Sequence, residues 1–174
     1  WRHVHDIFTS VGATNVSWVW CPNIDPNKEF RDIAPMYPGD AYVDWTGLDG
    51  YNWGTNPYRP AGWKTFDQLY SSTYHRIVDT IAPSKPMAIG EVGSTEYGGS
   101  KAAWIQEMLE DVPTKYPAIR GLLWFNRHAE GEPMDWSIET SSSSTSAFAN
   151  GIQNPAYVGN QYGSLPFGPI APAS

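Results

Sequence analysis

The chain has 174 residues, a formal net charge of -7 and a hydrophobic fraction of 41%. A chain of this length can bury one sizeable core, and its hydrophobic content argues against disorder. The acidic balance argues against nucleic acid as a partner, because a nucleic-acid-binding surface is normally basic. No apolar run approaches the roughly 18 residues that a membrane span needs, so we expect no membrane partner.

The first part of the chain predicts a helix followed by two strands. Apolar residues recur at helical spacing over residues 1–11, and Gly12 ends that run. Residues 15–20 (NVSWVW) are β-branched and aromatic, which is typical of a buried strand. One or two helical turns are expected within residues 30–37. Residues 42–48 predict the next strand, which leaves through Asp49, Gly50, Tyr51 and Asn52.

The second part predicts two further strands, each of which lies between helices. A loop rich in Gly, Pro and aromatic residues spans residues 53–63, and an apolar helical stripe follows over residues 66–81. The remaining elements are a strand after Pro86, a helix around Trp104 that ends near Pro113, a strand over residues 119–125, a serine-rich loop at 141–146 and a short helix at 147–152.

Alternating strands and helices predict an α/β fold with a parallel sheet. Four βα units make half of a (β/α)8 barrel of the TIM-barrel type, which normally needs about 250 residues. The competing open, doubly wound sheet would favour a glycine-rich turn after its first strand, where this chain has Cys21-Pro22-Asn23. We expect residues 1–159 to form the half-barrel and residues 160–174 to form a tail rich in Gly and Pro.

Glu91 is the first candidate for catalysis. It ends the apolar run of the segment KPMAIGEVGS, and a charge inside a core is costly unless it is paired. At the carboxyl end of a parallel barrel strand, the same position opens into the mouth of an active site. The alternative is a structural acid that caps the following loop.

Other strand ends offer hydrogen-bonding and aromatic side chains. A phenol beside a carboxylate, such as Tyr51, can hold that carboxylate ionised by donating a hydrogen bond. Glycoside hydrolysis uses two carboxylates across the scissile bond. For Asp49 the alternative is bracing an Asp-Gly turn, and for Trp124 it is ordinary core packing. The flat rings of Trp53 and Trp63 lie in a predicted loop, where exposure to a sugar is plausible.

No cofactor is expected. The four histidines do not pair with Cys or Asp at metal-ligand spacing, so we expect no metal site. A G-x-S-x-G motif is absent from the sequence. Cys21 is the single cysteine, so any disulfide would have to pair it outside this chain.

Four segments together resemble glycoside hydrolase family 26. They are WVWCPN, YPGDAYVDWTGLDGYN, KPMAIGEVGS and IRGLLWFN. The family includes endo-β-1,4-mannanases, and other members act on mixed-linkage β-glucan or β-1,3-xylan. The resemblance implies a (β/α)8 barrel of which this chain covers about the last four βα units. It also implies a retaining double displacement, a β-linked polysaccharide as partner, and secretion.

The resemblance also implies roles for individual residues. Glu91 matches the family's nucleophile, Asp49 and Tyr51 match a pair on its sixth strand, and Trp124 matches a sugar-stacking platform on its eighth strand. We expect the substrate-binding residues to be Asp49, Trp124, Asn52, Trp53, Trp63 and Trp20, and the catalytic residues to be Glu91 and Tyr51.

The chain departs from the family in one respect. The family's acid/base Glu lies in a His-Glu-Met-Asn type segment at the fourth strand, and this sequence holds no His-Glu pair. Because the chain begins with Trp1 rather than Met, we expect a fragment whose acid/base lies upstream. Two alternatives stay open, namely a non-catalytic carbohydrate-binding half-barrel and a fragment that pairs with its missing half or with a second copy.

Overall fold

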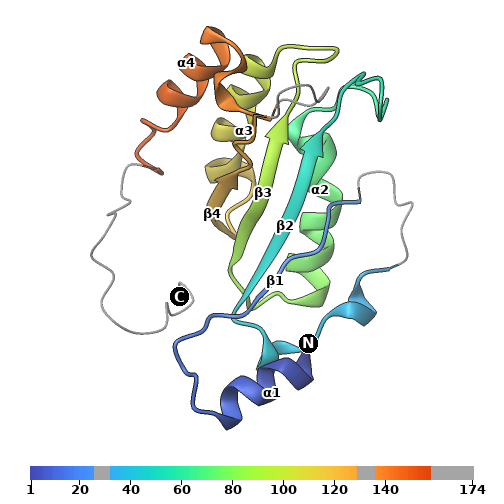
Figure 1. The fold of residues 1–174 in the computed structure, drawn as a ribbon, viewed down its shortest axis with the longest axis vertical. Helices are drawn as coiled ribbons and strands as arrows, with labels where there is room; N and C mark the ends of the chain where they lie inside the picture. The colour runs from blue at the N-terminus through green and yellow to red at the C-terminus, as the bar shows by residue number, and fades with distance from the viewer. Residues whose placement is uncertain (26–31, 129–135, 158–174) are drawn as a thin grey trace.

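The computed structural model describes residues 1–25, 32–128 and 136–157. Its strands form one parallel sheet in the order β1-β2-β3-β4 (Figure 1). An α-helix lies between β2 and β3 and another between β3 and β4, whereas the described residues between β1 and β2 hold 3-10 turns. The strands are β1 (Val19–Trp20), β2 (Trp45–Asn52), β3 (Met87–Ser94) and β4 (Ile119–Trp124). The α-helices are α1 (Arg2–Ser10), α2 (Phe66–Arg76), α3 (Lys101–Lys115) and α4 (Ser142–Gly151), and α2 continues as a π-helical turn over Ile77–Ile81. Short 3-10 turns occupy Ala34–Met36, Asp40–Tyr42 and Ile138–Thr140.

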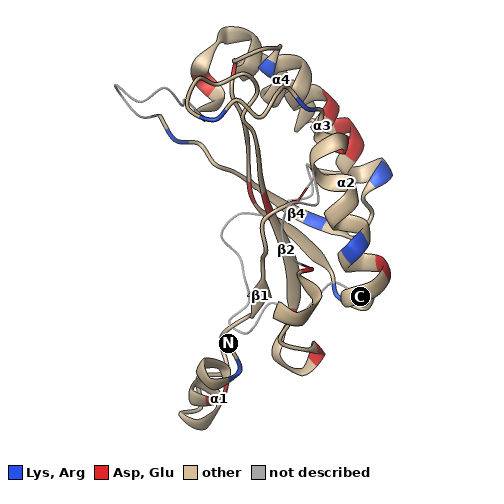
Figure 2. Ribbon diagram, turned by 90° about the vertical axis from the view of Figure 1, so that its right-hand side faces the viewer, with Lys and Arg blue, Asp and Glu red and all other residues tan. Residues whose placement is uncertain are grey.

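The predicted parallel α/β architecture is confirmed. Strands that follow one another in the sequence are also neighbours in the sheet. This order lacks the reversal that defines the switch point of a doubly wound sheet. Helices α2 and α3 lie on the same side of the sheet (Figure 2). Within the described ranges, no helix is both long enough and apolar enough to cross a membrane.

Several element boundaries differ from the predictions. The first strand is confined to Val19–Trp20, and β2 runs on through Asn52. Pro113 lies inside α3 rather than ending it. A proline lacks the N–H that would bond to the carbonyl four residues earlier. The Tyr157 hydroxyl donates instead to that carbonyl, on Leu109, at 2.9 Å.

The predicted serine-rich loop at 141–146 is wrong, because α4 begins inside it. The Ser141 hydroxyl accepts a hydrogen bond from the Ser144 amide at 3.1 Å, and the two side chains form a reciprocal cap. Serine favours the N-cap position because its side chain can satisfy such an unpaired amide. A run of serines can therefore start a helix as well as form a loop. The predicted tail at 160–174 lies outside the described residues.

The core lies between the sheet and its two covering helices. Leu48, Ile89 and Val92 on the strands are fully buried. The helix side is largely aromatic, and its Phe66 and Tyr70 rings stack at 4.4 Å between centroids. A capping box between Thr65 and Gln68 starts α2 at the level of the strand ends. The other buried members of this core include Leu69, Tyr74, Ile77, Trp104, Ile105, Met108 and Tyr116.

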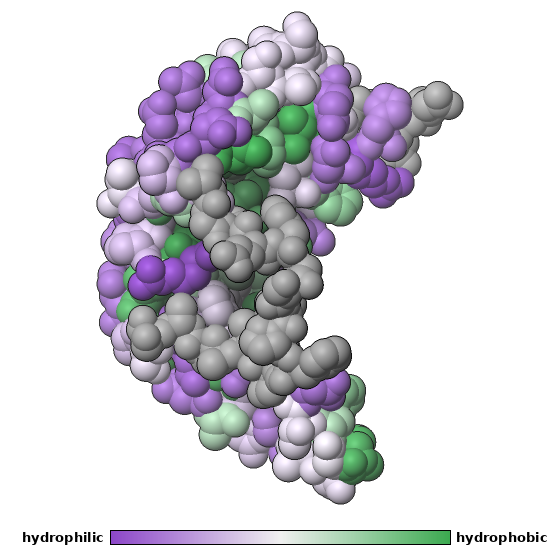
Figure 3. Space-filling model, turned by 90° about the vertical axis from the view of Figure 1, so that its left-hand side faces the viewer, coloured by the Kyte–Doolittle hydropathy of each residue, from purple (hydrophilic) through white to green (hydrophobic). Residues whose placement is uncertain are grey.

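Among the described residues, no helix covers the opposite face of the sheet. Leu122 and Trp124 pack towards the helix side, so Leu123 between them turns to the other face, where it is 61% exposed. Apolar side chains also gather on the surface at the end of the molecule that α1 forms (Figure 3). An open sheet face with two unpaired edge strands favours association with another chain.

We predict that the 174-residue chain, expressed alone, associates in a concentration-dependent way. Leu123→Lys should weaken this association, because it places a charge on the uncovered face. Met36→Lys is the matched control, since Met36 is 60% exposed and belongs to a 3-10 turn, not to a strand. Light scattering and sedimentation velocity measure the outcome. A monomeric wild-type chain across the concentration range would contradict the prediction.

Candidate active site

A shift in strand register brings two carboxylates together. Along β2 and β3, Leu48 pairs with Ile89, but the next pair is Asp49 with Glu91, so that Gly90 is skipped. Asp49 and Tyr51 are two residues apart on one strand and therefore project from the same face. The shift places Glu91 on that face as well.

Tyr51 and Glu91 are joined directly. The Tyr51 hydroxyl donates a short hydrogen bond to Oε2 of Glu91, whose side chain is exposed to solvent. Burial, the bond to Glu91 and the nearby carboxylates raise the pKa of the Tyr51 phenol above its ordinary value. Tyr51 therefore remains a protonated donor at neutral pH, and Glu91 offers its carboxylate to the open side of the sheet.

Asp49 is more enclosed than Glu91. The Cys21 thiol donates to Oδ1 of Asp49 across 3.1 Å, and the Glu91 amide also donates to this carboxylate. Burial raises the pKa of Asp49, and the negative charge of Glu91 raises it further. The two hydrogen bonds oppose this shift because they stabilise the charged form.

Aromatic rings surround Tyr51. The ring centroids of Trp136, Phe125 and Trp53 lie 4.6, 5.7 and 6.3 Å from that of Tyr51, and Trp53 lies 5.0 Å from Trp136. The Arg59 guanidinium lies 4.9 Å from the ring centre of Trp53, a cation–π arrangement. Tyr51 is therefore fixed at its ring as well as at its hydroxyl.

Trp136 and Phe125 are not among the residues predicted for this site. Phe125 carried a usable signal, since it follows Trp124 on an alternating strand and so turns to the opposite face. No sequence pattern marks Trp136 as a site residue, because it lies in a polar connection outside every predicted element. Only the folded chain brings it back to the sheet.

Two hydrogen bonds from the helix side hold Trp136 in place. The Trp124 indole N–H donates to the carbonyl of Trp136 at 2.7 Å, and the Lys101 ammonium donates to the carbonyl of Ser137 at 2.5 Å. Lys101 is fully buried. Gly93 lets the rings approach, because a Cβ there would lie 3.1 Å from Trp136 and 3.2 Å from Tyr51.

Two predicted sugar-binding tryptophans do not reach this group. Trp20 is 6% exposed and packs edge-on against Tyr37 at 5.0 Å. The ring of Trp63 lies against the backbone of Gly99, where an added Cβ would come within 2.4 Å of it. Trp20 is thus nearly fully buried, whereas Trp63 is half-buried.

Trp124 and Asn52 are also held by contacts within the chain. The ring of Trp124 lies 6.1 Å from those of Trp104 and Phe148, on the side of the sheet that the helices cover. Asn52 is 1% exposed, and its amide donates to the Ser94 hydroxyl at 3.1 Å. Trp124 thus lies on the helix side of the sheet. Asn52 is buried but also lines the pocket beside Tyr51, and Trp53 joins the Tyr51 group.

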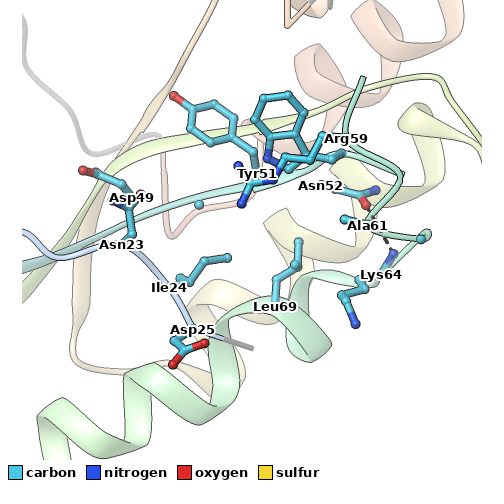
Figure 4. Close-up of a pocket in the computed structure, with 13 residues that line it drawn as sticks. Asn23, Ile24, Asp25, Asp49, Tyr51, Asn52, Arg59, Ala61, Lys64 and Leu69 are labelled. Carbon is cyan, nitrogen blue, oxygen red and sulfur yellow. Dashed lines mark hydrogen bonds between the residues drawn. The ribbon is translucent and has the colours of Figure 1, made fainter. Parts of the chain in front are cut away.

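A pocket of about 340 Å³ adjoins Asp49 and Tyr51. It lies between β2, the segment after β1, the loop after β2 and the start of α2 (Figure 4). Its volume is within the range of small-ligand sites. Its lining is Asn23, Ile24, Asp25, Asp49, Gly50, Tyr51, Asn52, Trp53, Arg59, Ala61, Gly62, Lys64 and Leu69. Among the residues that the structure describes, no three His, Cys, Asp or Glu side chains converge as a metal site.

A parallel sheet in this order, with carboxylates and aromatic rings at its carboxyl edge, is the architecture of a (β/α)8-barrel glycoside hydrolase. The model of glycosyl hydrolase family 26 matches residues 1–85. Endoglucanase H of Acetivibrio thermocellus is 39% identical over 151 residues, which are 87% of this chain and 16% of that protein. A mannan endo-1,4-beta-mannosidase of Bacillus subtilis is 34% identical over 102 residues, which are 59% of this chain and 23% of that protein.

Solved structures agree on the fold. An endo-beta-1,4-mannanase of Cellulomonas fimi has a TM-score of 0.60 at 21% identity, over 89% of this chain and 34% of that one. The catalytic domain of a Bacillus sp. JAMB-750 GH26 endo-beta-1,4-mannanase also has a TM-score of 0.60, at 20% identity. This match covers 90% of this chain and 42% of that one. Both are (β/α)8 barrels. The chain is thus similar to members of glycoside hydrolase family 26, and it spans about a quarter or less of the two curated relatives.

We predict that Trp136→Ala lowers the free energy of unfolding by about 3 kcal/mol, because it removes a buried ring beneath Tyr51. Trp136→Phe, which keeps an aromatic contact, should cost less than half as much. Urea denaturation of the two variants measures the difference. Equal losses for both variants would contradict the supporting role of the indole.

Proposed function

We propose that this chain supplies the nucleophile side of a retaining endo-β-glycosidase, with Glu91 as the nucleophile. The hydrogen bond from Tyr51 to the exposed Glu91 carboxylate carries the proposal. A nucleophilic carboxylate must be oriented and accessible, and a phenol fixed by surrounding rings serves the first need. The exposure of Glu91 on the face opposite the helices serves the second.

The proposed reaction proceeds in two displacements. An oxygen of Glu91 forms a bond to the anomeric carbon while the glycosidic C–O bond breaks. The leaving oxygen takes a proton from a second carboxyl group, which we place in the part of the barrel that this chain does not contain. That carboxylate then removes a proton from water, whose oxygen attacks the anomeric carbon and releases Glu91.

Other residues of the group would bind the sugar. Asp49 and Tyr51 lie beside Glu91, where they can contact the sugar next to the cleaved bond. Trp53, whose ring is half-buried and carries Arg59 at one side, is the aromatic side chain best placed to meet a neighbouring sugar. We give Trp20, Trp63, Trp124 and Asn52 supporting roles in packing.

The substrate class is a β-linked polysaccharide, and we propose β-1,4-mannan first. Two curated relatives, at 34% and 30% identity, are named as mannan endo-1,4-beta-mannosidases. β-Glucan is the second candidate, because the relative at 39% identity is named Endoglucanase H. Since such polymers are too large to cross a membrane, we place the enzyme outside the cell. Release of reducing ends from mannan and from mixed-linkage β-glucan, measured side by side, separates the two substrates.

We predict that Glu91→Ala, in a protein with the complete barrel, lowers kcat on the order of 10³-fold or more. Sodium azide should restore part of the turnover, because azide can occupy the space of the missing carboxylate. The product should be a glycosyl azide of inverted anomeric configuration, detectable by NMR. Glu110→Gln is the matched control, since the Glu110 side chain lies on the exposed face of α3 and accepts a hydrogen bond from Gln106.

Near-normal turnover of Glu91→Ala would refute the assignment of the nucleophile. Binding of mannan oligosaccharides without any cleavage by the wild-type protein would favour the alternative of a carbohydrate-binding module.

We also predict that Tyr51→Phe lowers kcat by roughly 10–100-fold, since a hydrogen bond to a charged group contributes about 1.5–3 kcal/mol. The fold should be retained, because the ring contacts with Trp136 and Phe125 do not need the hydroxyl. Steady-state kinetics and circular dichroism check both parts. An unchanged kcat would show that the phenol does not assist Glu91.

A further inference from the structure

The geometry points to Cys21 as a positioning residue of this site, which holds the Asp49 carboxyl beside the nucleophile through a thiol hydrogen bond. This inference rests on the proposed function and adds a residue to its machinery. Cys21 directly follows β1, so a third strand contributes to the pair of carboxylates on β2 and β3. Its thiol donates to Oδ1 of Asp49 at 3.1 Å.

Two glycines make room for this thiol. A Cβ at Gly47 would lie 2.5 Å from the Cys21 sulfur, and a Cβ at Gly90 would lie 2.8 Å from it. Neither distance is compatible with a side chain. Gly90 is also the residue that the strand register skips, and a Cβ there would come within 2.6 Å of Oδ1 of Asp49. The backbone of both neighbouring strands is thus shaped around the Cys21–Asp49 contact.

The contact is tied to the nucleophile through the backbone. The Gly90 amide donates to the Cys21 sulfur, and the Glu91 amide donates to the Asp49 carboxylate. The two amides belong to consecutive residues of β3. A change in the thiol would therefore move the Asp49 carboxyl and the peptide that carries Glu91 together.

The charges around Asp49 explain why a donor is useful at this place. Within the described part of the chain, the titratable groups that face it are Cys21, Tyr51, Glu91 and the buried Tyr70. None of these is a cation, and Glu91 repels a second negative charge. Burial and Asp49 raise the pKa of Cys21 to about 12, so the thiol keeps its proton and can donate across the working pH range. Its hydrogen bond favours ionised Asp49 against burial and repulsion.

The first experiment follows the thiol itself and needs no catalytic activity. In the protein with the complete barrel, the ¹³Cβ resonance of labelled Cys21, assigned by comparison with Cys21→Ser, is followed against pH. We expect no titration below about pH 10.5 in the wild type. In Asp49→Asn the midpoint should fall by at least about one pH unit, because a repelling carboxylate is gone. A midpoint that Asp49→Asn leaves unchanged would overturn the inference.

The second experiment separates positioning from packing. Cys21→Ala should lower kcat roughly 5–20-fold, change KM by less than about twofold, and move the acidic limb of the pH–rate profile to higher pH. Cys21→Ser keeps a donor and should retain activity within about threefold of the wild type. Equal losses in Cys21→Ala and Cys21→Ser, or an unmoved acidic limb in Cys21→Ala, would also overturn the inference. If the wild type cleaves none of the polysaccharides, the proposed function fails, and the NMR titration alone decides the thiol contact.

Discussion

The register shift between β2 and β3 is the constraint on which the rest of the site depends. Without it, Gly90 would pair with Asp49 and Glu91 would pair with Gly50, whose own Cβ position points at Ile24 and the Tyr70 hydroxyl in the helix-side core. The charged side chain of Glu91 would then enter that core, at a high cost in desolvation. Skipping one residue turns Glu91 to the open face, beside Asp49 and within reach of Tyr51.

The glycines near this shift serve it in different ways. Gly90 leaves space for the Cys21 sulfur and for Asp49, and Gly93 leaves space for the rings of Tyr51 and Trp136. The residue between them on the same face is Glu91. The two glycines of the segment Gly-Glu-Val-Gly thus leave space on both sides of the Glu91 carboxylate. Glycine normally weakens a central strand, and this need for space explains its presence at both positions.

Much of the fold could be predicted from the sequence because its signals are local. Alternation of apolar strands with amphipathic helices sufficed for the parallel sheet, and the Glu91–Tyr51 pairing followed from strand ends that meet at one edge. Local signals could not separate the aromatic residues that face the site from those that pack in the core. Trp20, Trp63 and Trp124 are tryptophans at strand ends or in the loop that follows a strand, as Trp53 is, so residue type alone does not separate them. In the structure they pack against other parts of the chain, Trp63 against Gly99 and Trp124 against Trp104. Trp136 depends on hydrogen bonds from Lys101 and Trp124, which no sequence period encodes.

The distribution of these contacts separates two parts of the proposed mechanism. The described groups that orient Glu91 and its neighbours come from β1 to β4 and the segments that follow them. The hydrogen bonds of Cys21 and Tyr51 join adjacent strands, and the ring contact between Tyr51 and Trp136 spans β3. The nucleophile can therefore keep its local geometry independently of the partner carboxyl. The distance between the two carboxyls, which decides between retention and inversion, depends instead on how the remaining strands close against the edges of β1 and β4. In the proposed mechanism, barrel closure thus controls the stereochemistry, whereas the register shift controls the orientation of Glu91.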